Sequence, residues 1–158
     1  MEKERIRDAE KLEQAIEFYA EDVEFELANP KIIRHWIKQI IEQEEKMLNH
    51  ISYIFCSDTY LHELNLQYLD HDTFTDIITF QYAKLPVVEG DIFISIDRIR
   101  ENAENYKATF ENELHRVMSH GVLHLCGYRD KEAAEKTHMT EKENQALQML
   151  QTSLNLKK

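Results

Sequence analysis

Apolar residues recur along the chain with two periods, and the change between them predicts an alternation of strands and helices. After Asn29-Pro30, a helix-start signal, apolar side chains are spaced by one and three positions through about residue 48, which is typical of one helical face. Runs rich in β-branched and aromatic residues predict strands instead. These strands are expected at residues 16–25, 51–56, 77–82 and 91–96, the last being apolar enough to lie centrally in a sheet.

Capping residues divide the rest of the chain into further helices. The expected helix-opening residues are Ser57 or Asp58, Asp97, Thr109, and finally Thr137 or Thr140. Residues 1–15 predict a frayed or helical lead-in, 70–76 a polar loop and 86–90 a turn. This order of elements predicts a single α+β domain over residues 1–158, in which a small mixed β-sheet is packed with helices.

Composition and charge narrow the classes of function. Hydrophobic residues make up 42% of the chain, which is enough for a packed core, and we expect neither a membrane span nor a secretory signal. The net charge of −11 counts against a nonspecific DNA coat, so neither DNA nor a membrane is an expected partner. Two cysteines, Cys56 and Cys126, cannot build a disulfide framework and indicate reduced thiols in a cytoplasmic protein.

The segment His120-Gly-Val-Leu-His124-Leu-Cys-Gly127-Tyr-Arg-Asp130 carries the candidate chemistry. Two histidines four residues apart lie on one face of a helix, where both rings can reach one cation. Gly127 allows the helix to end in a left-handed turn, and the reversed chain can then bring Asp130 back as a third ligand. Three protein ligands leave coordination positions open, which is typical of a catalytic zinc site. Cys126 points away from the histidine face and is expected to be a small buried residue.

Ligand spacing alone also fits a metallopeptidase. Metzincin-type peptidases have a similar arrangement, in which the third ligand also follows a glycine, but they place a glutamate directly after the first histidine as general base. In this chain that position is Gly121. As a peptidase, this chain would therefore lack the residue that deprotonates water.

The motif and its surroundings resemble the YbeY family of metal-dependent endoribonucleases that act in ribosomal RNA maturation. Besides His120-Gly-Val-Leu-His-Leu-Cys-Gly-Tyr, the segment from Asn65 to Phe80 resembles the family's stretch around its threonine-aspartate pair. Gly90-Asp91-Ile-Phe-Ile-Ser resembles its glycine-aspartate strand, and Met139 and Glu143 resemble its closing helix. These anchors keep their order and spacing from about residue 65 to residue 143.

The resemblance implies a fold and an activity. The implied fold is a small mixed sheet with the metal site on the helix that ends at Gly127, and the implied ligands are His120, His124 and Asp130 around one zinc ion or another divalent metal. The implied activity is hydrolysis of single-stranded RNA in 16S rRNA maturation, ribosome biogenesis and ribosome quality control. The implied partners are single-stranded rRNA and ribosomal particles or proteins. A non-catalytic ribosome assembly factor with a structural metal is the non-enzymatic alternative.

Two positions depart from the family pattern. Asp130 stands where the family usually has a third histidine, which adds negative charge and favours harder metal ions. Leu69 stands where the family usually has an arginine that faces the phosphate, and leucine offers no hydrogen bond to it. Arg116, one helical turn before His120, and Arg129 are the candidate replacements, and His71 is a weaker one.

Thr75 and Asp76 have two interpretations at the entry to the expected third strand. They form either a turn-capping pair or part of the wall of an RNA cleft. His115 and His138 are expected on the surface and not as additional metal ligands.

Overall fold

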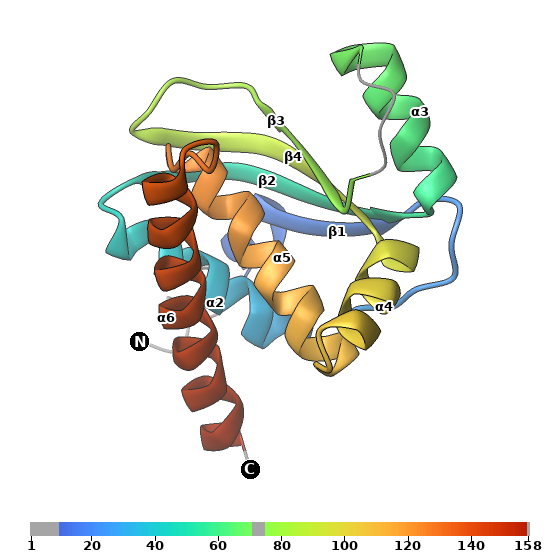
Figure 1. Ribbon diagram of the computed structural model, residues 1–158. Helices are drawn as coiled ribbons and strands as arrows, with labels where there is room; N and C mark the ends of the chain where they lie inside the picture. Colours follow the sequence, from blue (N-terminus) through green and yellow to red (C-terminus); the bar gives the residue numbers. More distant parts are fainter. Residues whose placement is uncertain (1–9, 71–74, 158) are drawn as a thin grey trace.

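The computed structural model describes residues 10–70 and 75–157, which fold around a sheet of four strands (Figure 1). The strands β1 (Ile16–Ala20), β2 (Met47–Cys56), β3 (Ile77–Gln81) and β4 (Val87–Ser95) lie in the order β1-β2-β4-β3. β1, β2 and β4 are parallel, whereas β3 runs antiparallel to β4 along one edge. The expected α+β class with a small mixed sheet is confirmed, and β4 lies centrally as predicted.

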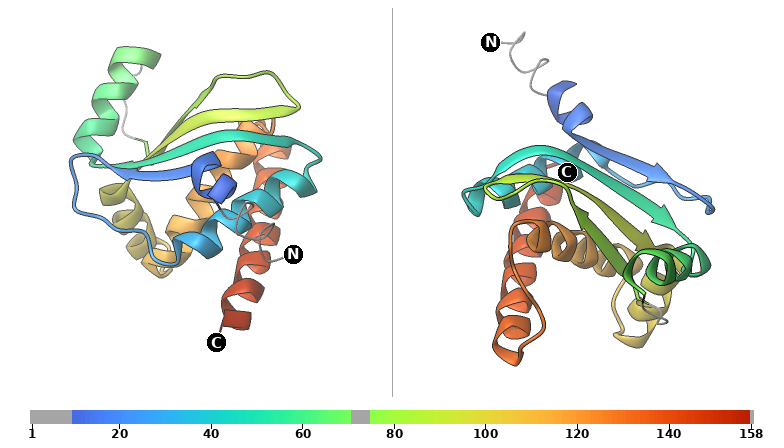
Figure 2. Two further views of the ribbon diagram at one scale, coloured as in Figure 1. Left: turned by 180° about the vertical axis from the view of Figure 1, so that it is seen from behind. Right: turned by 90° about the horizontal axis from the view of Figure 1, so that it is seen from above.

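Helices cover the two faces of the sheet unequally. α2 (Pro30–Gln43) and α5 (Phe110–Leu125) pack on one face, and the long α6 (Ala133–Lys157) packs on these two helices (Figures 1 and 2). α4 (Ile96–Asn105) follows β4 directly and contacts α5. α3 (Asp58–Leu69) lies on the other face, where Leu61 packs with Cys56 and Ile78 in a small cluster of its own. No helix within the described ranges is both long and apolar enough to cross a membrane.

The main core lies between the sheet and the helix pair α2 and α5. Alternate residues of β2, among them Ile51 and Tyr53, point toward these helices and are fully buried, as period-two patterning requires. The Tyr53 hydroxyl donates to the carbonyl of Met118 on α5 at 2.9 Å. The indole of Trp36 on α2 donates to the carbonyl of Ala146 on α6 at 2.7 Å, so the polar atoms of both buried rings are satisfied.

Several predicted boundaries are wrong because tertiary pairing decides where strands end. β1 stops at Ala20 and not at residue 25, since its partner β2 ends at Cys56, one residue beyond the Ala20–Phe55 pair. The predicted turn at 86–90 is mostly strand, because β4 pairs with β2 from Val87 onward. Its first partners are Met47 and Leu48, where the sequence predicts the end of a helix. α2 accordingly ends at Gln43, and β2 begins at Met47.

The predicted helix starts are right in part. Ser57 and Thr109 are N-caps whose side chains accept backbone N–H bonds, as expected. Ser95, and not Asp97, caps α4 by accepting from Arg98 N at 3.1 Å. α6 begins at Ala133, because the Glu135 carboxylate reaches back to the N–H of Glu132 at 2.9 Å, and the predicted starts at Thr137 and Thr140 lie inside the helix.

Parts of two predictions fall outside the described residues. Residues 10–15 of the expected lead-in are helical, while 1–9 are outside the described ranges. His71 and most of the expected 70–76 loop lie outside them as well.

Candidate metal centre

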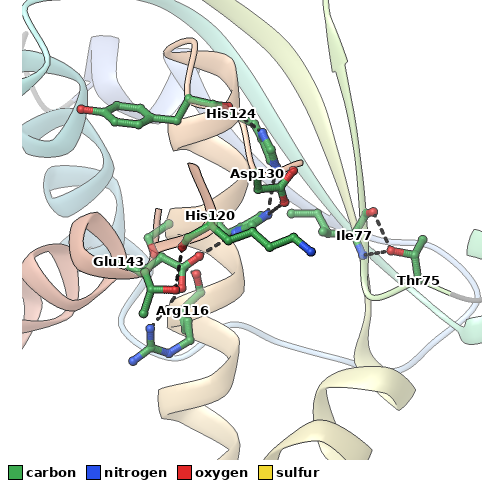
Figure 3. A network of polar contacts seen from close by, with 11 residues as sticks. Thr75, Ile77, Arg116, His120, His124, Asp130 and Glu143 are labelled. Carbon is green, nitrogen blue, oxygen red and sulfur yellow. Dashed lines mark hydrogen bonds and ion pairs between the residues drawn. The ribbon is translucent and has the colours of Figure 1, made fainter. Parts of the chain in front are cut away.

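α5 places the two histidines of the motif on one face. Thr109 caps the helix, and Glu111 and Glu113 in its first turn interact favourably with the positive end of the helix dipole. His120 and His124 follow one turn apart, and their Nε2 atoms are 2.9 Å from each other. The face that they occupy points toward the start of β3, so the site opens at the β3 edge of the sheet (Figure 3).

The chain reversal after α5 brings the third side chain to the same point. Gly127 has φ of 108°, the left-handed conformation that favours glycine. The N–H of Tyr128 donates to the carbonyl of Leu123 at 3.0 Å, and the N–H of Gly127 donates to that of His124 at 2.9 Å, which is the Schellman pattern of a helix end. Asp130 Oδ2 then lies 3.2 Å from Nε2 of His120 and 3.3 Å from Nε2 of His124 (Figure 3).

The hydrogen bonds on the far side of each ring fix which nitrogen faces the centre. Nδ1 of His120 lies 2.6 Å from a carboxylate oxygen of Glu143, and Nδ1 of His124 lies 2.9 Å from the carbonyl oxygen of Tyr128. Both partners are acceptors, so we assign the proton to Nδ1 in each neutral ring. Two Nε2 lone pairs and a carboxylate oxygen then face one another, an arrangement that a cation stabilises.

These three side chains form a group that could hold a metal ion. One ligand atom from each of His120, His124 and Asp130 lies within 4.8 Å of the other two. Tetrahedral zinc with bonds of about 2.05 Å would separate its ligand atoms by about 3.3 Å, close to the observed spacings. Two imidazole nitrogens and one carboxylate oxygen also match the ligand set of catalytic zinc sites.

Glu143 is part of this centre, although sequence reasoning gave it no role beyond an anchor of the family resemblance. It lies on α6 in the buried stripe that also contains Met139, Ala146 and Leu150. A carboxylate at a core position of an amphipathic helix is the signal that could have identified it, because a buried charge needs a partner. It binds both the ring of His120 and the guanidinium of Arg116.

Arg116 is engaged within the protein. Its guanidinium donates to Glu143 Oε1 at 3.0 Å and to Asn144 Oδ1 at 2.8 Å (Figure 3). The structure therefore places Arg116 in contact with the carboxylate that holds His120, which leaves it less available as the expected phosphate contact. Arg129 is exposed beside Asp130.

Two cavities meet at the centre and share His120, Asp130 and Asp76 in their walls. The larger, of about 520 Å³, runs along α5 toward its first turn, where Glu113 contributes to the wall. The smaller, of about 380 Å³, lies between α3 and β3 and includes Leu69, the residue in place of the family's arginine. Burial raises the pKa of Asp76, partly offset by His120, so its carboxyl retains a proton more readily than an exposed one.

Of the two interpretations of Thr75 and Asp76, a turn contact is observed at Thr75, whereas the wall of an RNA cleft stays a prediction. The Thr75 hydroxyl donates to the carbonyl of Ile77 at 3.2 Å, which is a local turn contact (Figure 3). Both residues also line the smaller cavity. Cys56 and Cys126 are both free, as expected, and both are buried, which was predicted for Cys126.

The two remaining histidines differ in environment. His138 is exposed, as predicted, and its ring lies against Tyr128. The prediction for His115 is wrong, because this side chain is buried against Trp36 in the core between α2 and α5. Burial lowers the pKa of His115 to about 4, so the ring is neutral at neutral pH.

Close packing explains why position 121 is a glycine. A Cβ atom at this position would lie 2.9 Å from side-chain carbons of both Ile77 and Ile92. The helix therefore approaches the sheet so closely that any side chain here would force Ile77 and Ile92 to shift. Packing thus disfavours a glutamate in the position that metzincins use.

Comparison with known proteins identifies the relatives of this chain. The family model described as "Endoribonuclease YbeY" matches residues 15–151. The chain belongs to the YbeY family. Curated YbeY endoribonucleases include one from Amoebophilus asiaticus that is 50% identical over 82% of this chain and 88% of its own length. Another, from Flavobacterium psychrophilum, is 46% identical over 85% of this chain and 96% of its own.

A solved relative supports the same fold. The solution structure of a protein from Thermotoga maritima has a TM-score of 0.61 and 26% identity, covering 90% of this chain and 93% of the other. The resemblance recognised in the motif is thus confirmed over most of the chain. Membership of YbeY supports endoribonuclease activity, a hydrolysis of phosphodiester bonds.

Proposed function

We propose that this protein is a zinc-dependent endoribonuclease that cleaves single-stranded rRNA in the cytoplasm. It would act in 16S rRNA maturation, ribosome biogenesis and ribosome quality control, with ribosomal particles or proteins as partners. The observation that carries the proposal is the convergence of His120, His124 and Asp130 at one point in a chain of the YbeY family. His120 also serves catalysis in this proposal, through the metal that it holds.

The metal and the residues around it would have separate roles at this site. When bound, a zinc ion supplies Lewis acidity, which lowers the pKa of water and polarises a phosphoryl oxygen. Glu143 and the carbonyl of Tyr128 keep both imidazoles turned toward the centre. The hydroxyl of Tyr128 donates to Glu44 at 2.6 Å, which anchors this turn to the end of α2.

Residues in and beside the walls of the two cavities would contact the RNA substrate. A single strand that crosses the centre would pass Asp76, which lines both cavities and would accept a hydrogen bond from a ribose 2′-hydroxyl. Thr75 borders the strand on the side of β3. Arg129, exposed beside the ligands, is the better candidate of the two arginines for a phosphate, since Arg116 is paired with Glu143.

The test compares wild type with His124→Ala and His35→Ala, purified in parallel, on a single-stranded rRNA fragment. His35 is an exposed residue of α2 and provides the matched histidine control. Cleavage by wild type and His35→Ala, with loss in His124→Ala, is the expected result. Equal cleavage by all three would mean a contaminating nuclease. Particle binding without any RNA cleavage would favour the non-catalytic assembly factor.

A further inference from the structure

The larger cavity holds a carboxylate that the metal centre does not use. The side chain of Glu113 is buried, with the residue only 5% exposed, yet it lines this cavity. Within the described ranges its carboxylate has neither a hydrogen bond nor an ion pair, unlike Glu143 nearby. Burial raises the pKa of Glu113; the carboxylates of Asp76 and Glu143 also raise it, whereas the Arg116 guanidinium lowers it. An acceptor that faces a cavity without a protein partner is open to donors from water or from a ligand.

The charges in the wall of this cavity disfavour two common ligands of a nuclease, a phosphate group and a second metal ion. Besides Glu113 it contains the carboxylates of Asp76, Asp130 and Glu143, which repel a phosphate. The guanidinium of Arg116, the cation in this wall, is already bound to Glu143 and Asn144. A second metal ion is also disfavoured, because the only group of ligand atoms close enough among the described residues is His120, His124 and Asp130. The cavity therefore suits an uncharged ligand with several N–H donors.

The position of the cavity fits one nucleotide beside the reacting phosphate. Glu113 precedes His120 by seven residues on α5, and Val117 between them lines the same wall. At 1.5 Å per residue, the two side chains are about 10 Å apart along the helix axis. This is the reach of a base from a neighbouring phosphate. Tyr106, 69% exposed at the rim of the cavity, offers an aromatic face of the kind on which unpaired bases stack.

We propose that this cavity binds the base of a nucleotide adjacent to the cleaved phosphate, with guanine preferred, and that Glu113 determines the preference. The proposal rests on the proposed ribonuclease function. Guanine presents N1–H and N2–H side by side, which one carboxylate accepts as two parallel bonds. Asn112, in the same wall, has an amide N–H that can donate to O6. Adenine and cytosine each offer one amino group without an adjacent ring N–H, and uracil offers a single ring N–H, so none of them can make this pair of bonds.

The first experiment measures cleavage of otherwise identical single-stranded RNAs that carry G, inosine, A, C or U next to the cleaved bond. Wild type is expected to cleave the G substrate with kcat/KM about tenfold above U, and inosine, which lacks the N2 amino group, is expected to fall between them. E113Q should lose most of this preference. E104Q removes an exposed carboxylate from α4, outside the cavity wall, and should keep it. Equal rates on G and U in wild type would overturn the proposal while leaving the nuclease intact.

A second experiment separates the subsite from the chemistry. Binding of guanosine 5′-monophosphate and uridine 5′-monophosphate is measured by titration of wild type, E113Q and E104Q. We expect the guanosine nucleotide to bind more tightly, and we expect this preference to be lost only in E113Q. If the preference is found but no RNA is cleaved, the nuclease function is refuted and the base-binding site is not. If E113Q fails to fold, Asn112→Ala, at an exposed position, provides the second variant and should reduce the preference several-fold. Binding without base preference would refute the subsite.

Discussion

Each histidine of the centre is oriented by a group on another part of the chain. Glu143 of α6 holds His120, and the turn after α5 holds His124 through the carbonyl of Tyr128. These contacts explain how a pair of histidines at helical spacing can form a metal site here. A free imidazole rotates and exchanges tautomers, whereas one with its Nδ1 bound presents Nε2 to a single point.

Glu143→Gln tests this orientation at the level of one side chain. The amide keeps the shape but loses the charge, so zinc affinity should fall about 10- to 100-fold. Competition with a chromogenic chelator gives the affinity. Glu141→Gln, an exposed change on the same helix, should leave it unaltered. Equal affinities in the two variants would contradict a role for Glu143 in holding His120.

His115 makes the protein sensitive to acid. Its pKa is lowered to about 4 by burial, so protonation favours the unfolded chain, where the pKa is ordinary at about 6.5. The free energy of unfolding is therefore unaffected by this ring above pH 6.5 and falls as the pH drops toward 4. At pH 5 the loss is about 2 kcal/mol. In His115→Phe the drop in unfolding free energy between pH 7 and pH 5 should be smaller by about that amount. Denaturant titrations at both pH values measure it, and the same drop as in wild type would refute this explanation.

Among the elements, α5 is closely packed against the sheet. Its approach to β3 and β4 at Gly121 brings His120 to the mouth of both cavities. Gly121→Ala should destabilise the protein by about 1–3 kcal/mol, because Ile77 and Ile92 must move aside. Alanine would otherwise stabilise a helix interior by about 1 kcal/mol. Chemical denaturation decides between the two effects, and increased stability would contradict the close packing.

The elements also show what the sequence can and cannot predict. Local signals found the helix caps at Ser57 and Thr109 and the left-handed turn at Gly127, because these depend on a few neighbouring residues. They failed at the C-terminal end of β1 and at the start of β4, which are decided by partner strands far away in the sequence. The three converging side chains were foreseeable from spacing. The pairing of Arg116 with Glu143 was not, since it joins α5 to α6.

At the scale of the whole molecule, the acidic charge sets how RNA can be bound. The chain has 30 acidic and 19 basic residues, and the cavity walls beside the centre are rich in carboxylates. Affinity must then come from the metal, stacking and base contacts more than from phosphate neutralisation. We expect the logarithm of the RNA-binding constant to fall with the logarithm of salt concentration with a slope of about −2 or shallower, because each neutralised phosphate contributes about −0.7 for single strands. A salt titration of binding by fluorescence polarisation gives the slope, and a value near −5 would indicate a basic binding surface.

Metal reconstitution of the protein is the measurement to make first. Protein stripped with a chelator is titrated with zinc while cleavage of a labelled single-stranded rRNA fragment is followed, in wild type and in His120→Ala. Cleavage should return as zinc approaches one equivalent per chain in wild type, and it should stay absent in the variant. Full cleavage by the stripped protein, or equal recovery in His120→Ala, would contradict a nuclease that works through the site of His120, His124 and Asp130.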